Sequence, residues 1–540
     1  MIFNYWKKFE KTIGSLKFAV IIISCFTLSM IIGTFLESYY GTDFANRMIY
    51  KTFWFMGIQF FMFLSIVFAA TLRLPPKKRL YGFYTIHSGL IIIGIGSLIT
   101  YVSGIDGSIF LSPNEPNRNI ILSRDVLKIT YPNDGKQYTY ILPFNAFSTK
   151  MNIELDQLTF TKFIPFAEGK LTFVNPSKEY GEEEVTQTSQ YHFKNAFAEQ
   201  DFTLTLHPEA SNEFQASFSM GPLNVNYLPI HIAECFKKES ASKLLFWNTE
   251  TKECFTAEEK KATIKETSSK NRFVAIPYKG SFLTFFPDFS PYPLDKDFQA
   301  DQKSPVKAFS KKLFEGKPSL FLFGPKAAYY DKNEQAWKVV DLEMNKAPIT
   351  LPWMGAELTL VNHETKKVPF NEPIPVVPIQ KNGSLIKGDL RAVQVNILGQ
   401  DYWVTSMSPL QLLVQGKKTI IEVTKESVKL PFELTLTEFK MDKDPGTMNP
   451  ASYESFVKLF TGKGTTEKHH IYMNHPLKYD GFTFYQASYS QDEQGVYSST
   501  LAVNVDQGRP LKYLGSLMLV FGSIWHYNLN KKKKKEEHTV

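Results

Sequence analysis

The sequence predicts an integral membrane protein with four transmembrane α-helices, three near the N-terminus and one near the C-terminus, and a large, mainly antiparallel β domain outside the membrane. Three observations support this fold class. Uncharged apolar runs gather at the two ends of the chain, basic residues cluster beside those runs, and the long middle of the chain alternates like β-strands.

Each apolar run is nearly long enough to cross a membrane. The runs 18–36, 52–72 and 82–104 contain no charged residue, and about 20 residues are needed to cross roughly 30 Å of hydrocarbon. A fourth run, 513–529, is uncharged but shorter. The first run is longer than the apolar core of a signal peptide, and a second run follows closely, so we expect a retained anchor.

Basic residues in the short connections orient the helices. They precede the first run, join the second to the third, and follow the fourth, at Lys7, Lys8, Lys11, Lys17, Arg73, Lys77, Lys78, Arg79 and Lys531 to Lys535. By the positive-inside rule, both termini lie in the cytoplasm, and the β domain lies on the outer or periplasmic face of the cytoplasmic (inner) membrane. The net charge of +8 therefore reports membrane orientation, and we expect no nucleic-acid partner.

The expected organisation follows from these runs. It comprises a cytoplasmic N-terminus (1–17), a first span (18–36), an external loop (37–51), a second span (52–72), a cytoplasmic basic loop (73–81), a third span (82–104), an external β-rich domain (105–509), a fourth span (510–529) and a cytoplasmic basic tail (530–540). Within the external domain, the segment 236–312 is richer in Lys, Ser, Thr and Pro, which indicates an insertion or a domain junction.

Cysteine and motif content excludes several protein classes. Without a Cys-Xaa-Xaa-Cys pair, the chain is neither a thioredoxin-type reductant nor a c-type cytochrome. Walker A, nucleophile-elbow and zinc-protease motifs are also absent, so we predict no catalytic residue. Cys235 and Cys254 fit either a disulfide or two separate thiols. His469 and His470 would point to opposite faces of a strand, which favours a solvated pair over a metal site.

One ionisable residue, His87, lies inside the third apolar run. Such a residue is costly in a membrane, so its default interpretation is functional. On a helix, Leu90, Ile91 and Gly94 share its face, and an apolar wall with a glycine notch suits a flat macrocycle. Neutral imidazole is a common haem ligand. Ordinary tight helix packing explains the same small residues, so both interpretations stay open at this point.

Two further features bear on His87. Thr85 or Ser88 could orient its ring through hydrogen bonds. His526, near the end of the fourth run, should lie toward the same leaflet, so the two histidines could meet. The sequence Trp525 to Tyr527 before a lysine run is, however, typical of an interfacial aromatic belt.

The layout of spans and β domain resembles the ResB/CcsB family of c-type cytochrome biogenesis, known as System II. The segment "SLKFAVIIISCFTLSMIIGTFLES" is similar to the family's first span, with Gly33 and Thr34 near its exit. "FWF" at 53–55 opens the second span as in the family, and His87 stands where the family has its intramembrane histidine.

Downstream, two further segments resemble the family, and the resemblance as a whole covers 5–114 and 430–528. "YMNHPLKYDGFTFYQASYS" is similar to its Asn-Xaa-Pro-Leu…Gly-Xaa-Xaa-Phe-Tyr-Gln signature, and "VNVDQGRPLKYLGSLMLVFG" to its last strand, turn and span. The family's Asp-Pro-Gly turn reads Asp-Gln-Gly here. The matched structural residues are Asn474, Pro476, Gly481, Tyr485, Gln486, Asp506 and Gly508.

The resemblance implies roles for these residues. His87 would be an axial ligand to the iron of a transient haem b, opposite a histidine of a partner, whereas His526 matches no family ligand and is expected to pack or lie at an interface. In the second motif, Pro476 would fix a turn, Gly481 would allow close approach, and Phe484 with Tyr485 would fill a sheet core.

The resemblance also implies partners and an activity. The chain would be one subunit of a holocytochrome c synthase, or haem lyase, complex and would be inactive alone. Its partners would be a CcsA/ResC-type membrane haem-handling protein and apocytochrome c, to which haem is delivered for thioether attachment, and a thioredoxin-like thiol reductant is a third candidate. Two alternatives remain: a membrane-anchored β-rich binding or structural protein without haem, and a stand-alone b-type haem protein that uses His87 and His526.

Overall fold

The structure is a computed structural model that describes most of the chain from residue 2 to residue 537. The description does not extend to residues 1, 176–186, 209–213, 242, 249, 267–271, 279–280, 286–305, 354, 382–383, 415, 444–445, 447–449, 462–463, 465, 493 and 538–540. The predicted insertion at 236–312 therefore lies partly outside the described residues.

Three helices of the described chain are long and apolar enough to cross a membrane, which confirms the three predicted N-terminal spans. They are α2 (Leu16–Tyr40), α4 (Phe53–Thr71) and α5 (Tyr81–Ser103), the last preceded by the short η2 (Lys78–Leu80). Side chains cap two of them: the Ser15 hydroxyl accepts the Phe18 amide at 3.2 Å, and the Thr52 hydroxyl accepts the Phe55 amide at 3.4 Å.

Shorter helices surround the first two spans. The helix α1 (Ile2–Ile13) precedes α2, and the Ser65 hydroxyl of α4 donates to the Ile13 carbonyl at 2.8 Å. Between α2 and α4, the predicted external loop forms α3 (Thr42–Ala45) and the π-helix η1 (Asn46–Tyr50). The elements α3 and η1 connect α2 to α4, so these two helices are neighbours in the sequence.

The predicted fourth span is a helix, α8 (Arg509–Glu537), but it does not meet the composition that marks α2, α4 and α5. Lys512 lies just before its apolar run, and His526 and Asn528 lie near the end of it. These polar residues lower the mean hydropathy, so a fourth span is not supported on composition.

The chain divides into two compact units, which are described separately. Unit 1 contains Met1–Glu168 and Pro373–Val540, and unit 2 contains Gly169–Glu372. The chain leaves unit 1 within the long strand β5 (Leu158–Val174) and returns within β21 (Val368–Pro375). Unit 1 is thus built from the two ends of the chain.

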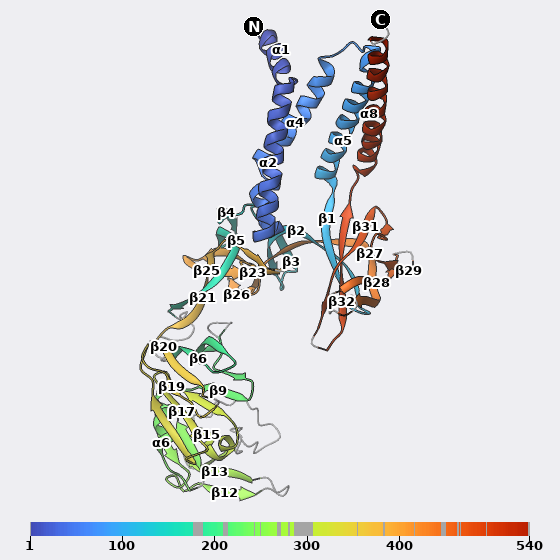
Figure 1. Ribbon diagram of the computed structural model, residues 1–540. Helices are drawn as coiled ribbons and strands as arrows, with labels where there is room; N and C mark the ends of the chain where they lie inside the picture. Colours follow the sequence, from blue (N-terminus) through green and yellow to red (C-terminus); the bar gives the residue numbers. More distant parts are fainter. Residues whose placement is uncertain are drawn as a thin grey trace. The chain divides into compact units, whose positions relative to one another are not determined.

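A ten-stranded sheet in unit 1 has the order β29-β28-β27-β2-β1-β32-β31-β30, with β26 beside β27 and β3 beside β2. In Figure 1, α5 runs directly into β1, and β32 runs directly into α8. The strands are β1 (Ile105–Leu111), β2 (Pro116–Tyr131), β3 (Lys136–Ile141), β26 (Leu410–Val414), β27 (Lys417–Lys443), β28 (Pro450–Phe460), β29 (Thr466–Ile471), β30 (Leu477–Tyr479), β31 (Phe482–Gln491) and β32 (Tyr497–Val505).

The two longest strands of this sheet, β2 and β27, line two different cores. Their register shifts between Ile121 and Asp125. On one side of this irregularity, Ile120 and Leu434 belong to a core with Leu459 and Val503. On the other side, the strands share a second core with β5, and this core contains Leu127, Ile129, Phe160, Phe163, Val393 and Ile421. A bulge lets one strand serve two packed layers.

The remaining strands of unit 1 form a smaller sheet and a hairpin. The smaller sheet has the order β21-β5-β24-β25, with β4 beside β5, and β22 pairs with β23. Their bounds are β4 (Thr149–Leu155), β22 (Ile379–Lys381), β23 (Ser384–Lys387), β24 (Leu390–Ile397) and β25 (Gln400–Thr405).

Unit 2 is also mostly β. Its sheets have the orders β18-β17-β16-β9-β8, β19-β20-β6-β7, β11-β10-β15 and β12-β13-β14, and β9 pairs with β16 in parallel. The strands are β6 (Gln187–Lys194), β7 (Glu199–Thr205), β8 (Ser217–Met220), β9 (Leu223–Tyr227), β10 (Leu244–Asn248), β11 (Cys254–Thr256), β12 (Thr263–Glu266), β13 (Arg272–Tyr278), β14 (Ser281–Phe285), β15 (Val306–Ser310), β16 (Ser319–Leu322), β17 (Lys326–Asp331), β18 (Ala336–Asp341), β19 (Ile349–Thr350) and β20 (Glu357–Thr365). The predicted, mainly antiparallel β domain is confirmed.

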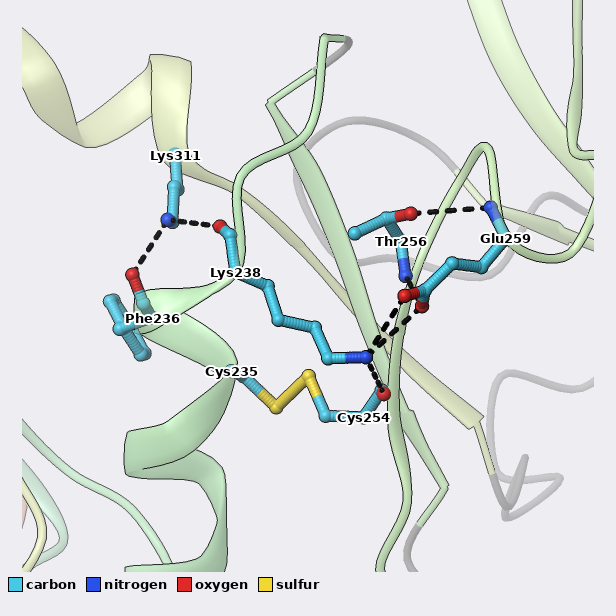
Figure 2. Close-up of a disulfide and its surroundings, with 7 residues drawn as sticks. All are labelled: Cys235, Phe236, Lys238, Cys254, Thr256, Glu259 and Lys311. Atoms are coloured by element: carbon cyan, nitrogen blue, oxygen red, sulfur yellow. Dashed lines mark hydrogen bonds and ion pairs between the residues drawn. A yellow bond between two sulfur atoms is a disulfide. The ribbon is translucent and has the colours of Figure 1, made fainter.

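The structure joins Cys235 and Cys254 by a disulfide, which resolves the alternative that the sequence leaves open. Cys235 lies on α6 (Ala233–Lys237), which follows η5 (Ile230–Ile232), and Cys254 begins β11. Beside the disulfide, the Lys238 ammonium donates to the Cys254 carbonyl at 2.8 Å (Figure 2). The Lys311 ammonium, on α7 (Lys311–Glu315), donates to the Phe236 and Lys238 carbonyls. The disulfide and the Lys238 bond hold α6 against β11, and the Lys311 bonds hold it against α7.

Candidate functional site

His87 lies two turns into α5, and its ring is held by the helix itself. Its Nδ1 lies 3.0 Å from the Phe83 carbonyl oxygen, and its ring packs on the Phe83 ring at 3.8 Å between centroids and 35° between planes. Because a carbonyl can only accept, Nδ1 carries the proton in this arrangement and Nε2 keeps its lone pair. The Thr85 hydroxyl, one of the two candidates to orient the ring, donates to the Tyr81 carbonyl instead.

This arrangement suits an axial ligand to haem iron. A histidine ligand typically donates its second ring N–H to a carbonyl or carboxylate, which fixes the tautomer and the ring orientation. The half-buried His87 has that anchor and an uncommitted Nε2. The Arg73 guanidinium lies 4.6 Å from the centroid of the Phe83 ring, so a cation able to pair with a propionate shares the same ring. The residues present therefore fit a haem.

The glycine notch predicted for the macrocycle is filled. A Cβ built on Gly94 would come within 2.5 Å of the Phe63 ring of α4, so this glycine admits a neighbouring helix. The prediction of an open notch beside His87 is wrong, because Gly94 serves the packing of α4 on α5.

His526 packs on another part of α5. A Cβ on Gly82 would lie 2.6 Å from the Cβ of His526, and the Trp525 ring packs on Tyr81 at 5.9 Å between centroids. At 100° per residue, Gly82 and His87 are separated by about 140° around α5. His526 is thus a packing residue on the α8 side, whereas His87 is directed elsewhere.

The α5–α8 contact is a seam of glycines. On α5 they are Gly82, Gly89 and Gly96, and facing them are Gly508 in the turn before α8 and Gly515 and Gly522 within it. A Cβ on Gly89 would lie 2.7 Å from the Gly515 carbonyl oxygen, and one on Gly96 would lie 2.9 Å from the Gly508 carbonyl oxygen. The seven-residue spacing on both partners lets the two backbones approach along their shared length, as small residues do between membrane helices.

A polar lock closes the end of this seam that lies beside the sheet. The Asp506 carboxylate accepts hydrogen bonds from the Thr100 hydroxyl of α5 and, at 2.7 Å, from the Lys512 ammonium of α8. The Lys512 ammonium also donates to the Thr100 hydroxyl at 3.0 Å. Burial alone would raise the pKa of Asp506, but the bonds from Lys512 and Thr100 hold that pKa below its ordinary value. Asp506 therefore ties β32, α5 and α8 together without the proline of the resembling motif.

The motif between β29 and β31 is architectural, with two changes from the predicted roles. Asn474 and Gly481 both take positive φ, +63° and +79°, so each forms a tight turn, with Pro476 between them. A Cβ on Gly481 would meet no atom within 4 Å, so this glycine serves conformation and not close approach. Phe484 is fully buried in the core, but Tyr485 is 39% exposed on the opposite face.

Two more matched residues make specific contacts. The Gln486 amide accepts from the buried Ser455 hydroxyl at 2.7 Å and donates to the Ser499 hydroxyl at 3.1 Å, which links β31 to β28 and β32. Gly33 faces the Tyr50 ring, which a Cβ would overlap, while the Thr34 hydroxyl bonds the Met30 carbonyl within α2.

A buried ion cluster, which the sequence analysis missed, connects the first helix pair to the sheets. Arg47 of η1 binds Asp43 of α3 at 3.0 Å and the Asp125 carboxylate of β2. Arg391 of β24 binds Asp125 at 3.1 Å and Asp43 at 2.9 Å, and Lys425 of β27 binds Asp125 at 2.8 Å. The side chains of Arg47 and Asp125 are 0% and 1% exposed, so these charges are fully removed from water.

Burial and the neighbouring charges shift the pKa values of two members of the ion cluster. Burial alone would raise the pKa of Asp43, but Arg47, Lys425 and Arg391 together hold it below the ordinary value. Burial lowers the pKa of Lys425 against the opposing pull of Asp125. The Arg47 guanidinium also lies 4.4 Å from the Phe144 ring centroid. No local spacing announces this cluster, because its members come from five separate elements.

Comparison with known proteins matches segments of the chain to one family and to two kinds of relative. Residues 411–502, from β26 into β32, match the ResB-like family. Protein NrfI of Wolinella succinogenes is 35% identical over 102 residues, which is 19% of this chain and 11% of that protein. The cytochrome c biogenesis protein CcsB of Prochlorococcus marinus, in strains MIT 9313 and MIT 9303, is 39% identical over 81 residues, 15% of this chain and 18% of that protein.

The matched segments thus span between about a tenth and a fifth of the relatives' own length. The matches nonetheless agree with one another. The ResB-like match, NrfI and CcsB all fall on a chain whose apolar helices and β domain have the layout that the sequence analysis expects. The chain is therefore a multi-pass membrane protein in which residues 411–502 match the ResB-like family.

Proposed function

We propose that this protein serves in cytochrome c biogenesis as the ResB/CcsB-type subunit of a complex that carries haem across the membrane and delivers it to apocytochrome c. The observation that carries the proposal is the anchored imidazole of His87, whose Nδ1 is directed at the Phe83 carbonyl and whose Nε2 is left to bind. An ionisable side chain is costly in an apolar helix, which indicates a function, and this helix belongs to a chain with a ResB-like segment.

Three residues of this chain would hold haem b. His87 supplies the axial nitrogen through Nε2, Phe83 keeps the imidazole plane in place, and Arg73 pairs with a propionate at the cytoplasmic end of α4. When bound, the haem supplies the iron that accepts this nitrogen and the vinyl carbons to which cysteine thiols add. The protein's own task is to position and shield it.

We assign the second axial position to a histidine of a CcsA/ResC-type partner. His526 packs on Gly82, about 140° around α5 from His87, so it is placed to close the α5–α8 seam. A ligand set shared between two chains makes haem binding depend on assembly of the complex. A thioredoxin-like reductant would keep the cysteines of apocytochrome c reduced.

We further propose that α8 crosses the membrane beside α5, with both termini in the cytoplasm. Its glycines recur every seven residues as those of α5 do, with Gly515 against Gly89 and Gly508 against Gly96. The strands β1 and β32 pair from Ile105 with Val505 to Leu111 with Ser499, so α5 and α8 join the sheet side by side. Packing against an apolar helix compensates for the modest hydropathy of α8. The basic clusters near 73–79 and 531–535 then lie on one side of the membrane.

The test is maturation of a reporter cytochrome c. Cells that lack their own pathway would express this chain, its candidate partner and an apocytochrome c, and covalently bound haem would be measured by haem stain after denaturing electrophoresis. We expect haem attachment with the wild type and with His526→Ala, and loss with His87→Ala at equal protein level. Arg73→Gln should reduce it, whereas Arg79→Gln, in the same basic loop, should not. Full attachment with His87→Ala would overturn the proposal.

A further inference from the structure

The short helix α1 carries three lysines on one face. At about 100° per residue, Lys7, Lys8 and Lys11 fall within about 100° of one another around the helix, and they are called the lysine face below. Together with Thr12, they line a shallow hollow on the surface of α1. Within the part of the chain that the structure describes, Lys8 and Lys11 form no ion pair. At least two of the three positive charges therefore have no carboxylate of the described chain beside them.

The opposite face of α1 packs on α4. Trp6, Phe9 and Ile13 recur on this face at helical spacing, and Ile13 is buried. The Trp6 and Phe9 rings both pack on the Phe68 ring, at 6.3 Å and 6.1 Å between centroids. The lysine face lies more than about 120° around the helix from the middle of this apolar face. The lysine face is therefore directed away from α4.

Contacts with α4 give the depth of α1 in the membrane. The Ile13 carbonyl accepts from Ser65, which lies about 9 Å along the axis from Thr71, the last residue of α4. A Cβ on Gly14 would lie 2.7 Å from the Leu72 Cδ1, just beyond that end. In Figure 1, α1 extends from α2 away from the sheets. The lysine face thus lies beside the last turns of α4, where a span passes from hydrocarbon to lipid headgroups.

Depth and charge together indicate what the lysine face binds. A helix with lysines on its polar face and Trp and Phe on its apolar face is typical of the membrane interface. Here α4 already covers much of the apolar face, so the lysine face is the part of α1 that is presented to the surroundings. At headgroup depth those surroundings include phosphate groups, whose oxygens accept hydrogen bonds from several ammonium groups at once. Lys7 and Lys11 lie four residues apart, where like charges repel, and an anion between them would remove that repulsion.

We propose that the lysine face of α1 binds the headgroup of an anionic phospholipid, in the leaflet where α4 ends. The ammonium groups donate to the phosphate oxygens, and the acyl chains of the lipid extend into the hydrocarbon beside α2 and α4. A bound lipid would hold α1, and with it the end of α4, at the membrane surface. This role depends neither on haem nor on which side of the membrane the helix faces.

The probe is short-chain phosphatidylglycerol. Delipidated full-length protein in detergent would be titrated with this lipid, and native mass spectrometry would count the lipids bound to each chain. We expect one phosphatidylglycerol to bind more tightly than any phosphatidylcholine. Binding of that lipid should weaken at least about tenfold in Lys7→Gln/Lys8→Gln/Lys11→Gln, because each lysine near a membrane surface contributes to the attraction of anionic lipid. The triple arginine variant at the same positions keeps the charge and should bind as the parent does.

The matched control removes the same charge from the other basic segment on this side of the helices. Lys77→Gln/Lys78→Gln/Arg79→Gln should retain the tight phosphatidylglycerol. Thermal unfolding of each variant, measured in parallel, separates lost binding from lost fold.

Four outcomes would overturn the inference. Equal binding by the glutamine variant of α1 and the parent would show that the lysine face is not the site. An equal loss in both glutamine variants would show diffuse attraction between charges in place of a site. Equal binding of phosphatidylcholine by the parent would remove the role of the anion, and displacement of the lipid by inorganic phosphate would assign the hollow to free phosphate. Because no haem is present, each result is independent of the proposed function.

Discussion

The protein contains two pairs of long helices that are held together in different ways. In the first pair, α2 and α4 are sequence neighbours joined by α3 and η1, and their junction is tied to the sheets by the ion cluster around Asp125. In the second pair, α5 and α8 meet along glycines, and the lock between Thr100 and Asp506 joins residues 406 positions apart. The first pair is thus fixed by charge and the second by close backbone contact.

The difference explains where a ligand can bind. On α5, the face with Gly82, Gly89 and Gly96 is used up by α8, and Gly94 is used up by Phe63 of α4. His87 lies away from the α8 contact, on the side of α5 where Gly94 meets Phe63 about two turns further along, and its ring is held by its own helix through Phe83. The same helix therefore carries one face that packs on α8 and another that presents His87.

The largest expected effect is on the glycine seam. Gly515→Leu places a side chain where even a Cβ would lie 2.6 Å from the Ile93 Cγ1, so α8 cannot keep its contact with α5. We expect the protein to fail to accumulate in the membrane. Immunoblots of membrane fractions measure this. Gly57→Leu on α4, where a Cβ would meet nothing within 4 Å, is the matched control. Normal accumulation of Gly515→Leu would show that the seam is not required.

The ion cluster should come next. Asp125→Asn removes a buried carboxylate and leaves Arg47 and Arg391 with Asp43 as the anion that they still share, and breaking such a buried pair costs about 3–5 kcal/mol. Thermal unfolding in detergent should show a large drop in midpoint. Asp134→Asn, which removes the exposed pair with Lys417, should leave the midpoint unchanged. Equal midpoints for the two variants would contradict a role for the cluster in stability.

The Asp506 lock should give a smaller effect that depends on pH. Because the pKa of Asp506 is lowered in the folded protein, its contribution is present above the unfolded value of about 4 and is lost as pH falls through the lower folded pKa. Asp506→Asn should destabilise the protein by about 1–2 kcal/mol at neutral pH and by less near pH 3. Unfolding midpoints across pH test this, and a difference that grows on acidification would contradict it.

His526 should matter least. His526→Ala keeps the backbone that covers Gly82, so we expect a loss of less than about 1 kcal/mol and no effect on haem. Gly82→Leu should be worse, because its side chain would collide with the His526 Cβ. Thermal unfolding compares the two. A stand-alone b-type haem protein that uses both His87 and His526 would instead lose haem in His526→Ala. This variant therefore also distinguishes that function from the proposed one.

The spans and the β texture were predictable because they depend on local composition. Uncharged runs found α2, α4 and α5. The seam was also visible in principle, since glycines recur every seven residues at 82, 89 and 96 and at 508, 515 and 522, but one sequence does not show that the two series face each other. His87 was found because a polar residue in an apolar run is costly.

The rest could not be predicted because it depends on tertiary contacts. Asp43, Arg47, Asp125, Arg391 and Lys425 meet only in the folded chain. The unit boundaries at residues 168 and 372 fall inside β5 and β21, where composition does not change. The fourth span stays a proposal, because the composition of α8 alone does not mark it as a span and the proposed crossing depends on packing against α5.

The most direct test of the central claim is the reduced-minus-oxidised absorption spectrum of the complex purified with its partner. The account predicts a six-coordinate bis-histidine spectrum for the wild type and His526→Ala. It predicts loss of that spectrum in His87→Ala, with folding and partner binding retained. A bis-histidine spectrum that persists unchanged in His87→Ala would contradict the assignment of His87 as the haem ligand.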